Sequence, residues 1–307
     1  MTVGEVDLEA GRRPLTLRSA IGWLVMIAAV VVVILVGNHH AHEIAHTLRT
    51  VSVWPVLGAA ALHAITLALR SEAWRIGLRA VGASTLPLGA IHRANALAFL
   101  VGTVQGELSL PARVAALRRA EPDRAPTAVQ TAMVDAPLAL VEIAGLFAFA
   151  ALWKPVLIVG TLAIAVALPV LARRVAPSRP EGSPLRGLMV ASDLAALRRL
   201  VVVMAGVVLV SALRVWVILL AFHLHADVTS VAKVIAAVTV IGVFPIGIGT
   251  GPAATIASLS SGVSATTTDG IAFSAGLAIS ATSVLGVLIY AVLTWGWSAR
   301  RLVVRRG

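Results

Sequence analysis

The chain has 307 residues, of which 59% are hydrophobic and 13% are charged, and its formal net charge is +11. Soluble domains carry about 25% charged residues, so this composition excludes a soluble catalytic domain and indicates a polytopic membrane protein. The arginines fall in short clusters between hydrophobic runs, a pattern that the positive-inside rule explains and that argues against nucleic-acid binding. The absence of cysteine excludes disulfides and cysteine nucleophiles.

The N-terminal quarter of the chain predicts two transmembrane helices. Residues 1–19 form a basic tail that we expect in the cytoplasm, and residues 20–37 form a hydrophobic run without a cleavage site. At about 1.5 Å per residue, this run is close to the length that crosses a hydrocarbon core of roughly 30 Å. Residues 51–69 form the second predicted span, and the arginines that follow place its far end in the cytoplasm.

Between these spans, the sequence His42-Glu43-Ile44-Ala45-His46 spells the H-E-x-x-H signature of zinc metallopeptidases. On a helix, His42 and His46 would share one face, and Glu43 could activate a water. A peptidase also needs a third protein ligand and would hold this motif inside a span. We therefore expect a solvated interfacial helix with no bound metal or cofactor, and peptidase activity is the third-ranked function.

Residues 86–110 form a hydrophobic run that polar and glycine residues interrupt and that arginines flank on both sides. Such a segment crosses an even number of times, and its length suits a re-entrant hairpin better than two full spans. Gly106 and Glu107 mark the expected tip of this hairpin.

The rest of the chain predicts four more spans and a second hairpin. The spans are residues 129–153, 155–171, 200–222 and 271–297, with a cytoplasmic loop at 173–199. Two shorter runs, 232–243 and 253–263, are joined by the glycine- and proline-rich sequence at 244–252, which cannot continue a helix. A basic tail at 300–307 is expected in the cytoplasm, so these two runs form a hairpin that enters from outside.

The predicted fold is all-α, with one transmembrane domain at 20–299 that contains six full spans and two opposed re-entrant hairpins. Broken helices of opposite orientation are typical of secondary transporters, because unwound backbone is tolerated in the bilayer only where it lines a cavity. The alternative is a set of short spans whose glycines allow close packing.

Ionisable side chains inside the spans are the candidate site residues, because burying each one in lipid costs free energy. Asp135 and Glu142 are seven residues apart and share one helix face, and Arg214 lies well inside its own span. We expect Arg214 to face Asp135 or Glu142, and this cluster, with Glu107, to contact a charged lipid headgroup or carry a coupling proton. The alternative is a buried ion pair that fixes helix register. His63 is expected to hydrogen-bond between helices.

Three stretches, at 70–82, 94–120 and 244–264, resemble the lysylphosphatidylglycerol synthase transmembrane-region family of flippase-like proteins. The resemblance covers nearly the whole chain and implies translocation of a lipid between leaflets. It implies aminoacylated phospholipids in members with a synthase domain and isoprenoid-linked lipids or glycolipids in stand-alone members. The chain resembles the membrane half of the family, so we expect no synthesis of lysylphosphatidylglycerol.

The motifs of this family are matched in part. Its Gly-Glu step resembles Gly106 and Glu107, with Arg113 as a stand-in because Leu110 occupies the expected arginine position. Its Asp-Arg pair is represented by Asp135 alone.

A second motif, a proline before a glycine-rich turn, resembles Pro245, Gly247 and Gly249. Gly251 and Pro252 replace the Arg-Glu pair that the family has next, which indicates a divergent branch.

The sequence therefore predicts a bacterial inner-membrane protein that binds or translocates an anionic lipid and is not an enzyme. The expected binding residues are Gly106, Glu107, Arg113, Asp135, Glu142, Arg214, Pro245, Gly247 and Gly249. The expected partners are membrane lipids. The alternative function is a non-transporting scaffold for a cell-envelope biosynthetic enzyme, in which the buried charges are structural.

Overall fold

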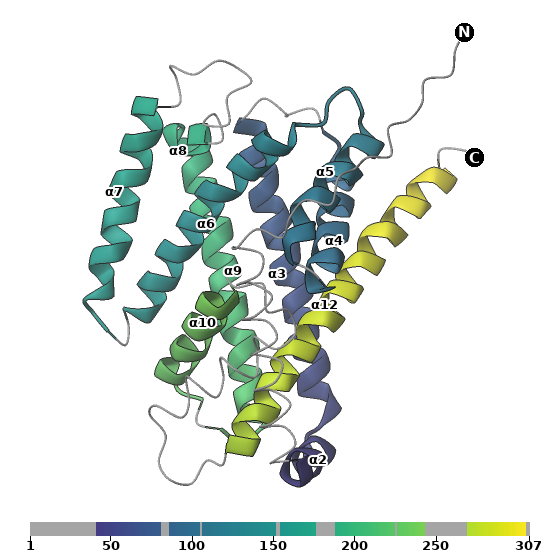
Figure 1. Cartoon of the computed structure of the whole chain (residues 1–307), viewed down its shortest axis with the longest axis vertical. Helices are drawn as coiled ribbons and strands as arrows, with labels where there is room; N and C mark the ends of the chain where they lie inside the picture. The colour runs from purple at the N-terminus through teal and green to yellow at the C-terminus, as the bar shows by residue number, and fades with distance from the viewer. Residues whose placement is uncertain are drawn as a thin grey trace, which may run out of the picture.

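The structure, a computed structural model, describes residues 41–80, 86–104, 106–151, 154–175, 188–224, 226–242 and 269–304. Every regular element within these ranges is a helix (Figure 1). Five of these helices are long and apolar enough to cross a membrane, so the protein is a helical, multi-pass membrane protein, as predicted. They are α3 (Val53–Ala80), α6 (Ala128–Ala150), α7 (Leu157–Val175), α9 (Leu194–Ala221) and α12 (Asp269–Val304).

The five helices correspond to five of the six predicted spans, and the remaining one, at 20–37, lies outside the described residues. Helix α3 continues to Ala80 instead of ending at residue 69. The helix can continue through this arginine-containing stretch because Arg70 and Arg75 both form ion pairs with acidic side chains.

The loop predicted at 173–199 is shorter than expected. A short helix, α8 (Met189–Ser192), lies within this stretch, and α9 begins at Leu194. The carboxylate of Asp193 caps α9 by accepting a hydrogen bond from the backbone N–H of Ala195 at 2.9 Å. At the other end of the chain, α12 extends into the basic tail predicted at 300–307.

A helical hairpin occupies the place of the first predicted re-entrant segment. Helix α4 (Leu88–Val104), the 3-10 turn η1 (Gly106–Leu108) and helix α5 (Ser109–Ala120) follow one another, and α4 packs along α5. The two arms approach closely, since a Cβ atom on Gly102 would lie 3.3 Å from the Cβ of Ser109. Helix α5 has 12 residues, a length of about 18 Å that is too short to cross a bilayer.

The second predicted hairpin lies mostly outside the described residues. Its first arm is α10 (Val228–Gly242), which begins four residues before the predicted run at 232–243. The predicted turn at 244–252 and the second arm at 253–263 fall outside the described ranges.

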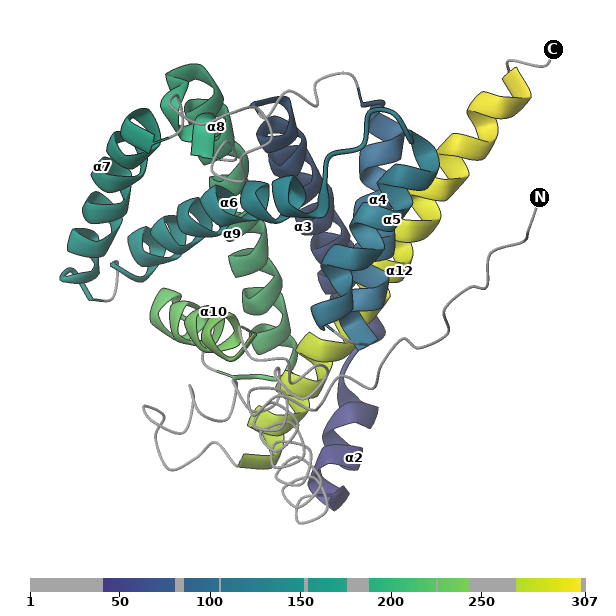
Figure 2. The ribbon, with the colours of Figure 1, turned by 45° about the horizontal axis from the view of Figure 1, so that its top comes forward.

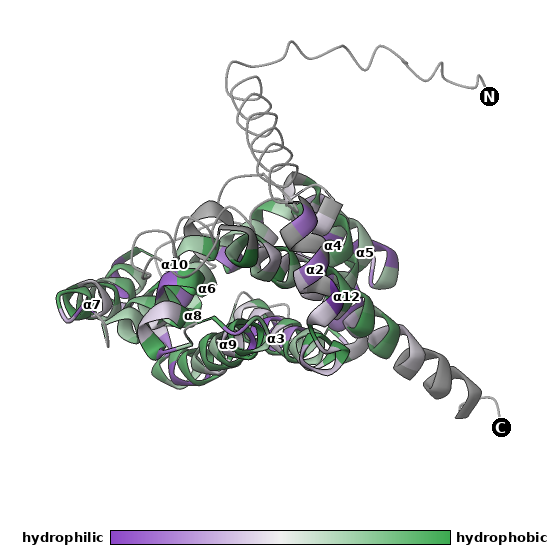
Figure 3. Cartoon of the chain, turned by 90° about the horizontal axis from the view of Figure 1, so that it is seen from below, coloured by the Kyte–Doolittle hydropathy of each residue, from purple (hydrophilic) through white to green (hydrophobic). Residues whose placement is uncertain are grey.

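Helix α3 is central to the packing, and its main neighbours are α9 and α12. Seen end-on, α9 and α3 lie side by side, α6, α10, α4 and α5 lie on one side of them, and α7 stands at the edge of the bundle (Figure 3). The tilted view shows the same arrangement, with α12 crossing α3 and α4 (Figure 2).

Arginine-rich helix ends gather at one end of the bundle, which we call the basic end. The C-terminal ends of α3, α5, α7 and α12 and the N-terminal end of α9 all lie there (Figure 1). The arginines in these helix ends are Arg79, Arg118, Arg119, Arg173, Arg174, Arg198, Arg199, Arg300 and Arg301.

Helix α6 contains a proline between its two acidic residues. Pro137 lies inside the helix, two residues after Asp135 and five before Glu142. Because proline has no backbone N–H, the carbonyl four residues before it has no helical hydrogen-bond donor, and the helix is weakened at this point.

Candidate functional site

The guanidinium of Arg214 lies in the interior of the bundle and joins three helices. Arg214, on α9, is 8% exposed. Its Nη1 atom is 2.8 Å from Nδ1 of His63 on α3. Its Nη2 atom donates hydrogen bonds to the backbone carbonyl of Ile279, to Oγ1 of Thr282 at 3.0 Å and to Oγ of Ser283 at 2.6 Å, all on α12.

These contacts correct one expectation and confirm another. The predicted pairing of Arg214 with Asp135 or Glu142 is wrong, because both acids have other arginine partners. His63 does hydrogen-bond between helices, as predicted. Within the described part of the chain, Arg214 forms no ion pair with a carboxylate, and its acceptors are a ring nitrogen, a carbonyl and two hydroxyls.

The close approach of α3 and α12 brings these groups together. A Cβ atom on Gly286 would lie 2.7 Å from the backbone oxygen of Ala60 and 2.7 Å from Cβ of His63. Only glycine fits this helix crossing without a shift, and the crossing places His63 beside the residues of α12 that hold Arg214.

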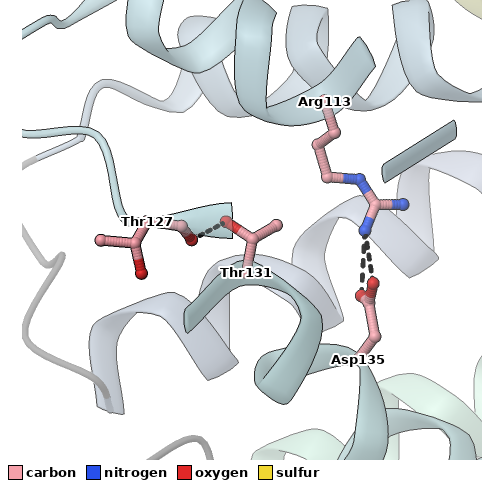
Figure 4. A network of polar contacts seen from close by, with 4 residues as sticks. All are labelled: Arg113, Thr127, Thr131 and Asp135. Atoms are coloured by element: carbon pink, nitrogen blue, oxygen red, sulfur yellow. Dashed lines mark hydrogen bonds and ion pairs between the residues drawn. The ribbon is translucent and has the colours of Figure 1, made fainter. Parts of the chain in front are cut away.

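The two acidic candidates on α6 each meet a different arginine. Arg113, on α5, donates from Nη1 to both carboxylate oxygens of Asp135 at 2.9 Å (Figure 4). The guanidinium carbon of Arg113 also lies 4.9 Å from the ring centroid of Trp74, at cation–π distance. Glu142 forms an ion pair with Arg70 of α3.

The start of α6 fixes the register of both acids. Thr127 and Gln130 form a capping box, in which the Thr127 hydroxyl accepts from the Gln130 N–H at 3.2 Å and the Gln130 side chain accepts from the Thr127 N–H at 2.9 Å. One turn later the hydroxyl of Thr131 donates to the Thr127 carbonyl at 2.9 Å (Figure 4). This anchored helix start directs Asp135 toward Arg113.

Two cavities lie between these helices. The Arg214 cavity, of about 470 Å³, is lined by polar and apolar side chains that include His63, Arg70, Glu142, Ser211, Arg214 and Ser283. The Arg113 cavity, of about 220 Å³, is lined by Arg70, Trp74, Asn95, Phe99, Arg113, Asp135, Leu138, Ala139, Glu142 and Met204. Arg70, Phe99 and Glu142 line both, so the Arg70–Glu142 ion pair stands between the two cavities.

The other predicted binding residues are not brought into these cavities by the described structure. Gly106 is exposed in η1 and lines neither cavity, whereas Gly102, one turn earlier in the hairpin, lines the Arg214 cavity. The side chain of Glu107 and the residues Pro245, Gly247 and Gly249 lie outside the described part of the structure.

Sequence reasoning missed Arg70 and Asn95. Arg70 was assigned to the end of a span because of its positive charge, yet it lies seven residues after His63 on the same helix face, a spacing that could have revealed it. Asn95, on α4, is 1% exposed, and neither polar atom of its amide has a hydrogen-bond partner among the residues that the structure describes. Buried amides are normally paired, so Asn95 stands out beside the cavity that it lines.

The H-E-x-x-H motif lies on α2 (Ala41–Thr50), which is the helix expected there. The side chains of His42 and His46 are exposed, and that of Glu43 lies outside the described residues. Among the described residues, no group of three histidine, cysteine, aspartate or glutamate side chains is placed to hold a metal ion.

No family model matches the chain, and comparisons with curated proteins and with solved structures find no match. The resemblance to the lysylphosphatidylglycerol synthase transmembrane-region family therefore stays a prediction.

Proposed function

We propose that the protein binds the anionic headgroup of a membrane lipid in the Arg214 cavity and moves the lipid between leaflets. The observation that carries the proposal is the buried Arg214 guanidinium, which forms no ion pair among the described residues.

The charge balance of the cavity supports an anionic ligand. Its other charged side chains, Arg70 and Glu142, are paired with each other, so Arg214 is left in excess. A buried charge without a counter-charge is unfavourable, and hydrogen bonds to neutral groups offset this cost in part. A phosphate or phosphodiester would supply the counter-charge through charge-assisted hydrogen bonds.

The location of the cavity supports a lipid as the ligand. Its walls come from apolar helices that cross the membrane, together with α10 and the α4–α5 hairpin. In this proposal the α4–α5 hairpin enters from the basic end and returns to it, and the segment after α10 forms the opposed hairpin. Short, interrupted helices around a polar cavity are typical of transporters. No covalent chemistry is needed, and the proposed location is the bacterial inner membrane with the basic end in the cytoplasm.

A scaffold function is the second candidate, and one observation favours it. The contacts of Arg214 join α3, α9 and α12, as expected of a clamp that only holds helices together. In that case the partner would be a cell-envelope biosynthetic enzyme, and replacing Arg214 would change stability without changing lipid movement.

Leaflet exchange in proteoliposomes distinguishes the two functions. Fluorescent phosphatidylglycerol and phosphatidylcholine report exchange through the fraction that a membrane-impermeant quencher reaches. We expect Arg214→Gln to slow exchange of phosphatidylglycerol by about tenfold or more, since a hydrogen-bonded charge contributes roughly 1.5–3 kcal/mol. Arg214→Lys keeps the charge and should slow exchange less.

Arg174→Gln is the matched control, because Arg174 is exposed at the end of α7 and lines neither cavity. Exchange by well-folded Arg214→Gln at the wild-type rate would contradict the transport proposal. Absence of exchange by the wild-type protein with both lipids would favour the scaffold.

A further inference from the structure

A large basin opens at the basic end of the bundle, between the last turns of α3 and the first turns of α9. Its volume is about 1210 Å³. The side chains that line it combine charged and apolar groups: Glu72, Arg75, Ile76, Arg79, Ala80, Asp193, Leu194, Ala195, Ala196, Arg198, Arg199, Val202 and Val203. We infer that this basin, the α3–α9 basin, binds an anionic membrane phospholipid at a site separate from the two inner cavities.

The charges of the basin are unbalanced. Glu72 forms an ion pair with Arg75, whose Nε donates to the carboxylate at 2.7 Å. The carboxylate of Asp193 caps the start of α9. Among the described residues, Arg79, Arg198 and Arg199 form no ion pair and are exposed. The basin therefore presents three arginines that form no ion pair with any carboxylate in the described part of the chain.

Helix geometry places the basin on the outer face of α3. The residues of α3 that line it lie at 72, 75, 76 and 79, whereas those that line the inner cavities include 63, 67, 70 and 74. At 3.6 residues per turn, residue 72 is rotated by about 200° from residue 70 around the helix axis. The basin and the inner cavities therefore lie on opposite sides of α3.

The α9 wall of the basin continues into a face that contacts lipid. Val202 lines the basin, and Leu209, Leu213 and Trp216 follow it at helical spacing on α9. All four are exposed although they lie in an apolar membrane span. Since exposed apolar side chains of a span face hydrocarbon, the basin is open to lipid along one side.

The depth of the basin suits a headgroup. Helices α3 and α9 have 28 residues each, so each is about 42 Å long and extends beyond a hydrocarbon core of about 30 Å. The arginines lie in the terminal turns, at the level of phosphates, while Ile76, Val202 and Val203 lie deeper, at the level of acyl chains. Basic pockets between helices at this level bind anionic headgroups.

The apolar walls favour a lipid over a free anion. Inorganic phosphate would use the arginines alone and would leave the apolar side of the basin in contact with bulk lipid. A phospholipid with net negative charge places its phosphate among the arginines and its chains along the face at Val202, so it satisfies both parts of the site.

The experiment measures phospholipid binding by the full-length protein in nanodiscs of phosphatidylcholine. The probe is phosphatidylglycerol with a photoreactive group in its acyl chain, and mass spectrometry locates the crosslinks. The test variant is the triple Arg79→Gln, Arg198→Gln, Arg199→Gln. The control triple, Arg118→Gln, Arg119→Gln, Arg174→Gln, removes the same charge from exposed arginines at the same end that do not line the basin.

We expect crosslinks in residues 194–203 of the wild-type protein. The basin triple should weaken binding by about tenfold or more, because Arg79, Arg198 and Arg199 line the site, and the control triple should leave it nearly unchanged, because its arginines do not. Equal loss in both triples would overturn the site in favour of diffuse attraction, and loss in neither would overturn it outright. Competition by millimolar inorganic phosphate would overturn the choice of a lipid.

This inference does not depend on the proposed function. Arg214 does not line the basin, so Arg214→Gln should retain the crosslinks at 194–203 even where it abolishes leaflet exchange. Loss of the crosslinks in Arg214→Gln would show that the basin is not a separate site.

Discussion

Glu142 on α6 and Arg70 on α3 form an ion pair that stands between the Arg214 cavity and the Arg113 cavity. Glu142, one of the two acids that the sequence placed opposite Arg214, is therefore bound to another arginine. The side chain of Arg70 is 42% exposed and that of Glu142 is 18% exposed, so the pair is partly shielded from water or lipid headgroups.

Breaking this pair on one side should destabilise the protein. We expect Arg70→Gln to lower the free energy of unfolding by about 1–3 kcal/mol, below the 3–5 kcal/mol of a fully buried pair because Arg70 is partly exposed. Chemical denaturation in detergent measures the change. The double variant Arg70→Gln, Glu142→Gln should recover part of the loss, because no unpaired charge remains; a double variant with the summed loss of both single variants would contradict the coupling.

Replacing Asn95 with leucine should raise the stability of the protein and lower its lipid exchange. Asn95→Leu replaces a buried amide that has no partner among the described residues with an apolar side chain of the same branching and number of heavy atoms, so we expect the ligand-free protein to become more stable by about 1–2 kcal/mol. Lipid exchange should fall, since Asn95 lines the Arg113 cavity, which shares Arg70 and Glu142 with the proposed binding cavity at Arg214. Thermal unfolding and the exchange assay on the same preparation test both effects. A destabilised Asn95→Leu protein would mean that the amide has a partner in the folded protein.

Gly286 should tolerate no side chain. Gly286→Ala places a methyl group 2.7 Å from a backbone oxygen of α3, and we expect a loss of about 1–3 kcal/mol from the resulting separation of the helices. Gly58→Ala is the matched control on the facing helix, because its Cβ meets nothing within 4 Å. That change should be neutral or stabilising by up to about 1 kcal/mol. Equal melting temperatures of the two variants would contradict the close approach.

The H-E-x-x-H motif should be dispensable. Glu43→Gln is expected to leave lipid exchange unchanged, because His42 and His46 are exposed and lie in a helix without a third ligand among the described residues. Isothermal titration with zinc should show no tight site. Loss of function in Glu43→Gln, together with zinc binding that requires His46, would support the peptidase instead.

The sequence predicted the helices of this protein well and their polar contacts poorly. Long apolar runs must be helical in lipid, so α6, α7 and α12 lie where hydropathy placed them. The break between α4 and α5 also lies where glycine and glutamate interrupt the run.

Pairing of charges depends on the rotation of each helix, which hydropathy does not specify. Arg214 was expected to pair with an acidic residue, but the orientation of α9 directs its side chain toward His63 and toward the hydroxyls and carbonyl of α12. Serine and threonine are so common in apolar spans that the sequence did not identify Thr282 and Ser283 as hydrogen-bond partners of Arg214. Arg70 was missed for a related reason, since an arginine near the end of a hydrophobic run looks like a topology signal.

Pro137 makes α6 easier to bend at one point along its length. Asp135 and Glu142 lie on opposite sides of this weak point, and each holds an arginine from a different helix. A bend at Pro137 can pull one carboxylate from its arginine while the other stays in place. In the proposed function, the Arg113–Asp135 and Arg70–Glu142 ion pairs can therefore separate one at a time as the helix bends.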